Sequence, residues 1–286
     1  MKVSEILKKN KITLSLEVFP PKTSDKYEDT AATAKQIAAL KPHFMSVTYG
    51  AGGGNGHFTA GIASQIQQEY GVPVLAHLTC VSSTKTFVAE MVERYKSLGI
   101  ENILALRGDI PATGRLAEDY QHAIELIQEL KMHGQFCIGG ACYPEGHIEC
   151  AHKEDDIRYL KEKVDAGLDF VTTQLFFDNN IYYNYLYRIR EKGIYIPVIA
   201  GIMPITNASQ LARSVSMSGT DVPQRFRNMV DHYGDHPAAM RQAGIIYATE
   251  QIIDLIANGV RHIHVYTMNK PSVAAEIMNN LSEVLR

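Results

Sequence analysis

Short apolar segments alternate with longer amphipathic segments along the whole chain. The apolar segments have the length of buried strands, and the segments between them repeat apolar residues at helical spacing. Strands that alternate with helices predict βαβ units and a parallel sheet. The predicted strands cover 13–20, 44–49, 72–80, 102–108, 136–144, 170–177, 197–204 and 262–268. The clearest predicted helices cover 84–98, 118–132, 153–166, 179–192 and 240–258.

The number of these units predicts a closed (β/α)8 barrel, the TIM barrel, over residues 1–286 as one catalytic domain. Such barrels typically take about 250 residues. We interpret the first ten residues as a short amphipathic helix and residues 219–237 as an elaborated connection after the seventh strand. The alternative is an open, doubly wound sheet. That fold usually binds a nucleotide through a glycine-rich first turn, which this chain lacks.

Composition places the chain among ordinary folded proteins. Of 286 residues, 45% are hydrophobic and 21% are charged, and the net charge of −3 provides no basic footprint for nucleic acid. No segment approaches the roughly 18 apolar residues of a membrane span, and the first residues lack a secretory signal, so we expect a cytoplasmic protein. The four cysteines show no CxxC spacing, and we expect them to be reduced thiols.

Glu17 is the candidate acid of the first predicted strand. Side chains alternate along a strand, so Glu17 shares one face with Ser15 and Phe19, while Leu16 and Val18 share the other. In a barrel, the face of Glu17 would point inward. Burial among apolar neighbours would raise the pKa of its carboxyl, which suits a general acid. The alternative is a structural glutamate paired with a buried arginine or lysine.

The end of the fourth predicted strand carries Arg107, Gly108 and Asp109. A glycine between two charges lets the backbone approach a ligand closely, whereas the alternative is a surface salt bridge within a turn. The glycine-rich segment 50–56 follows the second strand, and its amides could bind an anion. It matches neither the dinucleotide-binding nor the Walker pattern, so by itself it is weak evidence.

Two further strands place polar side chains on inward faces. Gln174 lies on the sixth strand, and its amide offers both a donor and an acceptor to a heterocycle. His262 and His264 point the same way on the last strand. Two such histidines can bind a metal, but we expect packed, hydrogen-bonded side chains.

The segment after the fifth predicted strand contains Tyr143 and His147, which we expect to line a ligand site. The alternative is a zinc site that combines His147 with Cys142, Cys150 and His152. The spacing of these four residues matches no common structural zinc site, so we expect no metal.

Together these segments resemble the methylenetetrahydrofolate reductase family in its short bacterial form. The resemblance extends from Ser15 to Lys270 and rests on several motifs in the right order. The motifs are SLEVFPPK at 15–22, SVTYGAGG at 46–53, HLTC at 77–80, LALRGD at 104–109, YPEGH at 143–147, KVDAG at 163–167 and TQLFFD at 173–178.

The resemblance implies a flavin barrel that transfers electrons from NADH or NADPH through FAD to 5,10-methylenetetrahydrofolate. The product would be 5-methyltetrahydrofolate, formed with ping-pong kinetics and supplying methyl groups for methionine synthesis. Glu17 would be the general acid, Asp109 would lie by the flavin and the pterin, and Gln174, Gln210 and Lys270 would contact folate or nicotinamide. The implied FAD contacts are Thr48, Tyr49, Ala51, His77, Arg107, Gly108, Asp109, Tyr120, Tyr143, His147, Asp156 and Lys163.

The chain departs from the family pattern at several positions, among them Val18, Ala200, Ser214 and Lys270. Ser214 falls where some members carry an aromatic residue, and Lys270 stands where arginine is frequent. Because the sequence ends at Arg286, we expect no C-terminal regulatory domain. We expect a homo-oligomer with small-molecule substrates and no nucleic-acid or membrane partner. Two alternatives stay open: another FAD barrel, such as a proline dehydrogenase-like oxidase, or a folate-reducing subunit fed by a ferredoxin or iron–sulfur partner.

Overall fold

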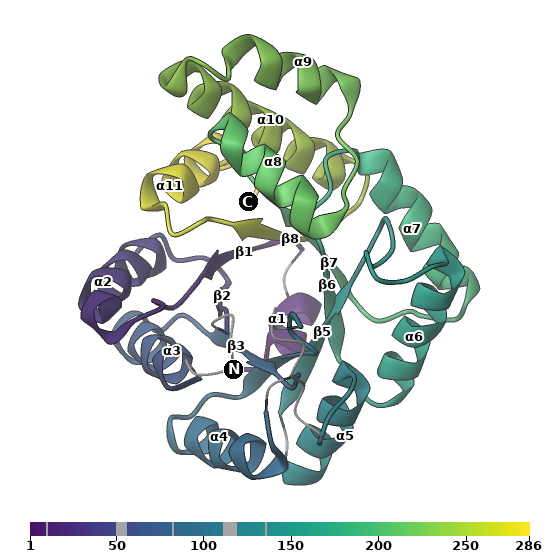
Figure 1. Cartoon of the computed structure of the whole chain (residues 1–286). Coiled ribbons are helices and arrows are strands. Elements are labelled where there is room, and N and C mark those ends of the chain that lie inside the picture. The colour runs from purple at the N-terminus through teal and green to yellow at the C-terminus, as the bar shows by residue number, and fades with distance from the viewer. Residues whose placement is uncertain (10, 50–55, 82, 111–118, 135) are drawn as a thin grey trace.

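A computed structural model describes the chain except for residues 10, 50–55, 82, 111–118 and 135. Within the described residues, eight parallel strands close into a barrel in chain order, and β1 pairs with β8 (Figure 1). The predicted (β/α)8 barrel is therefore confirmed and the open sheet is excluded. The strands are β1 (Thr13–Val18), β2 (Phe44–Val47), β3 (Val74–Thr79), β4 (Asn102–Leu106), β5 (Cys137–Cys142), β6 (Phe170–Thr173), β7 (Val198–Ile202) and β8 (His262–Tyr266).

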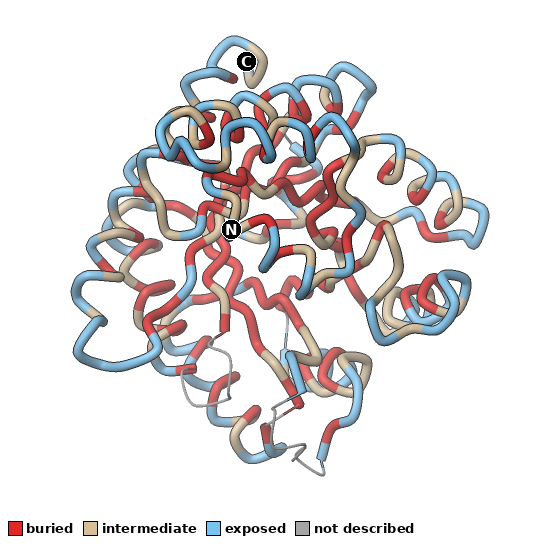
Figure 2. The backbone as a smooth tube through the Cα atoms, turned by 45° about the horizontal axis from the view of Figure 1, so that its top comes forward, coloured by how far each residue is buried: buried red, intermediate tan, exposed pale blue. Residues whose placement is uncertain are grey.

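Helices surround the barrel, and their buried faces pack on the strands while their outer faces meet solvent (Figure 2). The predicted helices are confirmed, with two starts displaced: the helix predicted from 118 begins at Ala123, and the helix predicted from 240 begins at Pro237. The helices are α1 (Val3–Lys9), α2 (Tyr27–Ala38), α3 (Gly56–Tyr70), α4 (Lys85–Ser97), α5 (Ala123–His133), α6 (Lys153–Asp165), α7 (Asn179–Glu191), α8 (Ala208–Ser218), α9 (Gln224–Tyr233), α10 (Pro237–Ala257) and α11 (Pro271–Asn280), with a 3-10 turn η1 (Ser24–Lys26) before α2.

The connection after β7 is more regular than predicted. Residues 219–237 contain helix α9, which buries only Phe226 and Val230 and exposes most of its charged residues. Its apolar residues at 226, 229, 230 and 233 recur at helical spacing, so the sequence carried a helical signal that the prediction of an irregular connection overlooked. It lies on the outside of the molecule against α10 (Figure 1).

Helix α1 closes the N-terminal end of the barrel. Its buried Val3, Ile6 and Leu7 form one apolar cluster with inward side chains of six strands, among them Phe44 and Phe170. The predicted N-terminal helix is thus confirmed, and its position fills the end of the barrel opposite to the C-terminal ends of the strands. Active sites of such barrels lie at the C-terminal face. Because α1 and its apolar cluster fill the N-terminal end, the C-terminal face of the barrel is where we look for the active site.

The alternation predicted for β1 holds along the strand. Leu14, Leu16 and Val18 are buried against the surrounding helices in the main core, whereas Ser15 and Glu17 point into the barrel. Phe19 lies beyond the strand end and is 40% exposed, so its predicted inward position is wrong. Among the described residues, no helix combines the length and the apolar character needed to cross a membrane.

Candidate functional site

Two adjoining cavities open at the C-terminal ends of the strands. The barrel cavity, of about 410 Å³, is lined by residues that include Glu17, Asp109 and Gln174. The outer cavity, of about 470 Å³, lies between α5 and α6. Arg107, Tyr143 and other residues line both, so the two form one elongated site. Each volume falls in the range of ligand pockets, which is about 300–1,000 Å³.

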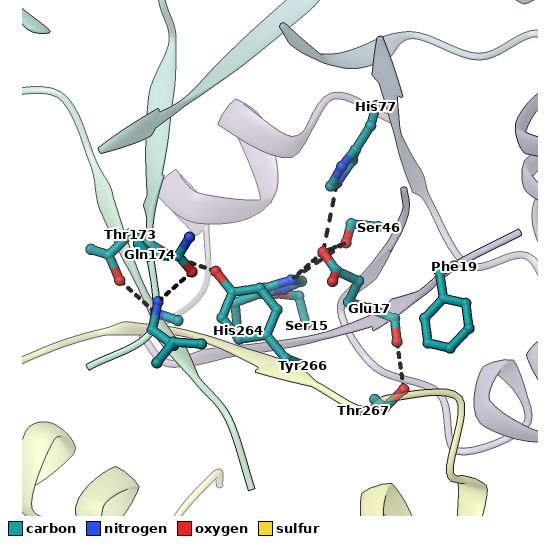
Figure 3. Close-up of polar contacts among 12 residues, drawn as sticks. Ser15, Glu17, Phe19, Ser46, His77, Thr173, Gln174, His264, Tyr266 and Thr267 are labelled. Atoms are coloured by element: carbon teal, nitrogen blue, oxygen red, sulfur yellow. Dashed lines mark hydrogen bonds and ion pairs between the residues drawn. The ribbon is translucent and has the colours of Figure 1, made fainter. Parts of the chain in front are cut away.

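Glu17 is the centre of a polar cluster inside the barrel (Figure 3). Its Oε2 accepts a hydrogen bond from Ser46 Oγ at 3.1 Å and lies 3.5 Å from His264 Nε2 and 3.8 Å from His77 Nε2. The parallel pairing places these groups in one layer, because Glu17 is in register with Ser46 on β2 and with Tyr266 on β8. The partners of Glu17 are therefore histidines and a hydroxyl, and the alternative of a paired arginine or lysine is wrong.

The electrostatics of Glu17 differ from the sequence expectation. Burial raises the pKa of its carboxyl, but the hydrogen bond to His264, the charges of His77 and His264, and the Ser46 hydroxyl together lower it below the ordinary value. The predicted raised pKa is thus wrong, because the expectation counted burial without the polar partners. Burial also lowers the pKa of His77 to about 4, so this imidazole is neutral at pH 7.

His264 is held in a fixed orientation by β1. Ser15 Oγ lies 2.8 Å from His264 Nδ1 and donates to the Ile263 carbonyl. This arrangement turns Nε2 towards Glu17. His262 is likewise hydrogen-bonded, to Thr13 Oγ1 at 3.0 Å, which confirms that both histidines are packed and hydrogen-bonded. The contact of His264 with Glu17 was not predicted.

Gln174 lies beside Tyr266 at the rim of the barrel cavity (Figure 3). Its Oε1 accepts from Leu175 N at 2.9 Å, so the amide nitrogen is the group that it can offer to a ligand. Tyr266 donates its hydroxyl to the Thr173 carbonyl at 2.6 Å. Gly201 makes room for this ring, since a Cβ there would lie 2.6 Å from the Tyr266 oxygen.

The turn after β4 is shaped for close packing. Gly108 has a φ of +87°, and a Cβ there would lie 2.9 Å from Thr79 Cβ, so the position requires glycine. Arg107 does not pair with Asp109 in a local salt bridge, but forms a two-pronged ion pair with Glu149 at 2.6 and 3.0 Å. Asp109 is exposed and lines the barrel cavity.

The outer cavity contains a half-buried cation. Lys163 Nζ donates to the Ala141 carbonyl at 2.9 Å, and burial lowers the pKa of its amine. Burial likewise raises the pKa of Asp156, which lines the same cavity. An ammonium has three donors, and a half-buried one with a single described carbonyl partner suits an anionic ligand such as a phosphate. Tyr143 and His147 meet edge to face, with ring centroids 4.6 Å apart, where the two cavities join.

Of the remaining residues predicted to bind ligands, some line the cavities and others lie outside them. Thr48, Tyr49 and Gly108 line the barrel cavity with His77. Tyr120 belongs to the hydrophobic core and is absent from the described lining of both cavities. Gln210 and Lys270 also lie outside that described lining, and Thr206 joins them by hydrogen bonds. Ala51 lies outside the described residues.

The cysteines do not gather around a metal. All four are free, and Cys150 Sγ donates to the His152 carbonyl at 3.2 Å. The described part of the chain contains no group of three or more histidine, cysteine or acidic side chains arranged to hold a metal ion. Ser214 is buried in α8, and its Oγ donates to Met203 Sδ at 3.2 Å.

The fold and the cavities define a barrel enzyme with a buried carboxylate–histidine cluster beside an elongated ligand site. A family model for methylenetetrahydrofolate reductase matches residues 2–282. The chain belongs to this family of oxidoreductases, which act on methylenetetrahydrofolate.

Named relatives agree with this membership. The chain is 35% identical to 5,10-methylenetetrahydrofolate reductase of Pectobacterium carotovorum, covering 95% of this chain and 90% of the relative. It is 34% identical to methylenetetrahydrofolate reductase (NADH) 1 of Zea mays, of which it spans only 50%. Among solved structures, a Clostridium thermocellum protein described as binding two copies of 5-methyl-5,6,7,8-tetrahydrofolic acid shares the fold. Its TM-score is 0.64 at 11% identity, covering 99% of this chain and 100% of that one.

Proposed function

We propose that the chain reduces 5,10-methylenetetrahydrofolate to 5-methyltetrahydrofolate with FAD and a nicotinamide nucleotide in a ping-pong reaction. The observation that carries this proposal is the cluster of Glu17, His264, His77 and Ser46 inside a cavity that continues into the outer cavity. The reaction needs a proton donor, which the Glu17 cluster would provide, and room for a large cofactor, which the two joined cavities would provide. The Zea mays relative carries NADH in its name, which supports a nicotinamide nucleotide as the donor.

The residues of the elongated site fit FAD. Lys163 would meet a phosphate as a half-buried cation, and Tyr143 and His147 would contact the cofactor where the cavities join. Arg107 lines both cavities and would face the same region of the cofactor. Its guanidinium would either keep its ion pair with Glu149 or exchange it for a phosphate. Bound FAD would supply hydride transfer, whereas the protein supplies binding, orientation and electrostatics.

Glu17 would hold the proton that opens the five-membered ring of the folate. Its carboxyl is ionised at pH 7, because histidine and serine contacts lower its pKa. A bound folate would exclude water, and the same burial effect that already raises this pKa would then increase. His264 lies 3.5 Å from the carboxylate and is the adjacent group able to share a proton with it. We propose that the pair delivers the proton.

Asp109 and Gln174 would orient the substrate from two sides of the barrel cavity. Asp109 is a carboxylate at the cavity mouth, where it would stabilise the cation formed when the folate ring opens. The Gln174 amide nitrogen would donate to the pterin. Gln210 and Lys270 would contact folate or nicotinamide farther out. The product would provide methyl groups for methionine synthesis.

The test is anaerobic spectroscopy of the purified chain reconstituted with FAD. We expect NADH or NADPH to bleach the flavin absorbance, and methylenetetrahydrofolate to restore it with formation of 5-methyltetrahydrofolate. Steady-state rates should give parallel double-reciprocal lines. Flavin that is reduced by proline, and whose reduced form is not reoxidised by methylenetetrahydrofolate, would support the proline dehydrogenase-like alternative. Flavin that is reduced by ferredoxin but not by either nucleotide would support the subunit alternative.

A further inference from the structure

Thr206 lies where the loops after β7 and β8 meet. Its hydroxyl oxygen is 2.7 Å from Lys270 Nζ and 3.1 Å from Gln210 Oε1. The threonine is 7% exposed, so these hydrogen bonds are shielded from water. Because an ammonium can only donate, Thr206 Oγ1 accepts from Lys270, and its own hydrogen is directed to Gln210.

Gln210 is already engaged on both sides of its amide. Its Oε1 also accepts from Thr206 N at 3.0 Å, and its Nε2 donates to the Pro204 carbonyl at 3.0 Å. The Gln210 side chain therefore joins the two ends of the loop 204–210 by hydrogen bonds. Its amide oxygen already accepts two of them. A ligand would find one N–H of this amide. Gln210 thus holds the Thr206 hydroxyl in place, and the hydroxyl in turn faces the lysine.

Lys270 has no acidic partner within ion-pair distance in the part of the chain that the structure describes, and its described hydrogen bond is the one to Thr206. Burial and the nearby Arg241 lower the pKa of its amine. Arg241 itself is paired with Glu276 at 2.8 Å. Lys270 is therefore a cation with two donors available, at the same end of the barrel as Glu17.

We propose that Thr206 is a positioning residue that holds Lys270 in place to receive an anionic group of a substrate. A lysine carries its charge on a flexible four-carbon stem, so one fixed acceptor on its ammonium reduces the freedom that a ligand must otherwise restrict. The anion is a carboxylate of the folate or a phosphate of the nicotinamide nucleotide. This inference rests on the proposed function for its substrates, but the Thr206–Lys270 coupling is measurable without them.

The experiment compares four forms of the FAD-loaded protein with wild type: Thr206→Val, Thr206→Ser, Lys270→Ala and the double variant Thr206→Val/Lys270→Ala. Valine keeps the shape of threonine without its hydroxyl, whereas serine keeps the hydroxyl. We expect Thr206→Val to raise the KM of one substrate by about five- to tenfold with kcat within twofold, a factor that corresponds to one ordinary hydrogen bond. Thr206→Ser should stay within twofold of wild type.

The substrate whose KM rises identifies the anion, folate or nucleotide. In the Lys270→Ala background, Thr206→Val should have no further effect, because the two residues would act as one unit. A full additional loss in the double variant would overturn the proposal. So would a defect in Thr206→Ser equal to that in Thr206→Val, because it would assign the effect to packing.

A second measurement does not depend on turnover. Competitive acetylation with acetic anhydride, read by mass spectrometry across pH 7–10, reports the protonation of Lys270 in each variant. Removing the acceptor disfavours the ammonium, so we expect Lys270 in Thr206→Val to react at lower pH than in wild type or Thr206→Ser. Identical profiles in all three would overturn the contact. Altered profiles in a protein without folate activity would retain the Thr206 contact and reject the proposed function.

Discussion

Asn269 binds the backbone of Phe19 with both ends of its side-chain amide. Phe19 N donates to Asn269 Oδ1 at 2.9 Å, and Asn269 Nδ2 donates to the Phe19 carbonyl at 2.9 Å. The pair joins the chain just beyond β1 to the turn beyond β8, which places the segment of Glu17 against the loop that carries Lys270. Asn269 has a φ of 52°, a left-handed conformation in which asparagine is among the better tolerated residues.

We expect Asn269→Ala to lower the free energy of unfolding by about 2–3 kcal/mol. Two hydrogen bonds contribute roughly 1 kcal/mol each, and alanine adds about 1 kcal/mol of backbone strain. Asn269→Gly removes the hydrogen bonds but tolerates the conformation, so it should lose about 1 kcal/mol less. Urea unfolding followed by circular dichroism measures both. An alanine variant as stable as wild type would show that the two hydrogen bonds between Asn269 and Phe19 contribute nothing to stability.

Glu17→Gln should separate the two halves of the proposed reaction. Reduction of flavin by NADH needs no proton for folate, so its rate should stay within a few-fold of wild type. Reoxidation by methylenetetrahydrofolate should slow by about 10²–10⁴-fold, the range for losing a general acid. Stopped-flow absorbance follows each half-reaction separately. Equal slowing of both would assign Glu17 a structural or flavin-positioning role.

His264→Asn tests what sets the protonation of Glu17. The hydrogen bond from His264 is the largest effect that lowers the pKa of Glu17, so its removal should raise that pKa. An acid with a higher pKa keeps its proton to higher pH. The descending limb of the pH profile for folate-dependent reoxidation should therefore move to higher pH, while flavin reduction keeps its own profile. A limb that stays in place or moves to lower pH would remove His264 from this role.

Lys163→Ala should weaken retention of FAD by about tenfold or more, because a buried charge-assisted contact to a phosphate is lost. Lys161→Ala is the matched control on the same helix, since Lys161 is partly exposed and pairs with Asp165 at the surface. The flavin-to-protein ratio after gel filtration, and titration of the apoprotein with FAD, give the affinities. Full retention in Lys163→Ala would exclude the lysine from the cofactor site.

Stability should decline on mild acidification because of His77. Burial lowers its pKa to about 4, whereas the unfolded chain has the ordinary value of 6.5. Between these two values the unfolded state binds the proton first, so stability that is complete above pH 6.5 is lost as the pH falls towards 4. The loss is at most about 3 kcal/mol. Unfolding curves of His77→Gln should fall less steeply with pH than wild type, while His57→Gln, at an exposed position on α3, should follow wild type.

Local sequence information was sufficient for the barrel and for several inward side chains. Strand alternation correctly placed Ser15 and Glu17 inside and Leu16 outside, because the twofold period of a strand is a property of neighbouring residues. Gln174 and Asp109 line the same cavity as predicted from their positions at strand ends. The prediction of one irregular connection over 219–237 overlooked helix α9, although the apolar residues of this helix recur at helical spacing.

The partners of Glu17 could not be predicted from local sequence information. Ser46 is 29 residues away and His264 is 247 residues away, and only the pairing of β1 with β2 and β8 brings them together. Burial alone predicted a raised pKa, whereas the assembled neighbours lower it. The same holds for Lys270, whose contact with Thr206 depends on the packing of two loops that follow different strands.

By itself, the amino-acid sequence determined the order of the strands and of most helices, the inward positions of Ser15 and Glu17 on β1 and, through its motifs, the family. These depend on short-range periodicity and on residues read in chain order. The tertiary structure alone decided which inward groups touch, the ionisation of Glu17 and the joining of two cavities into one site. Those properties depend on distances between residues far apart in the chain, and the closure of the barrel sets these distances.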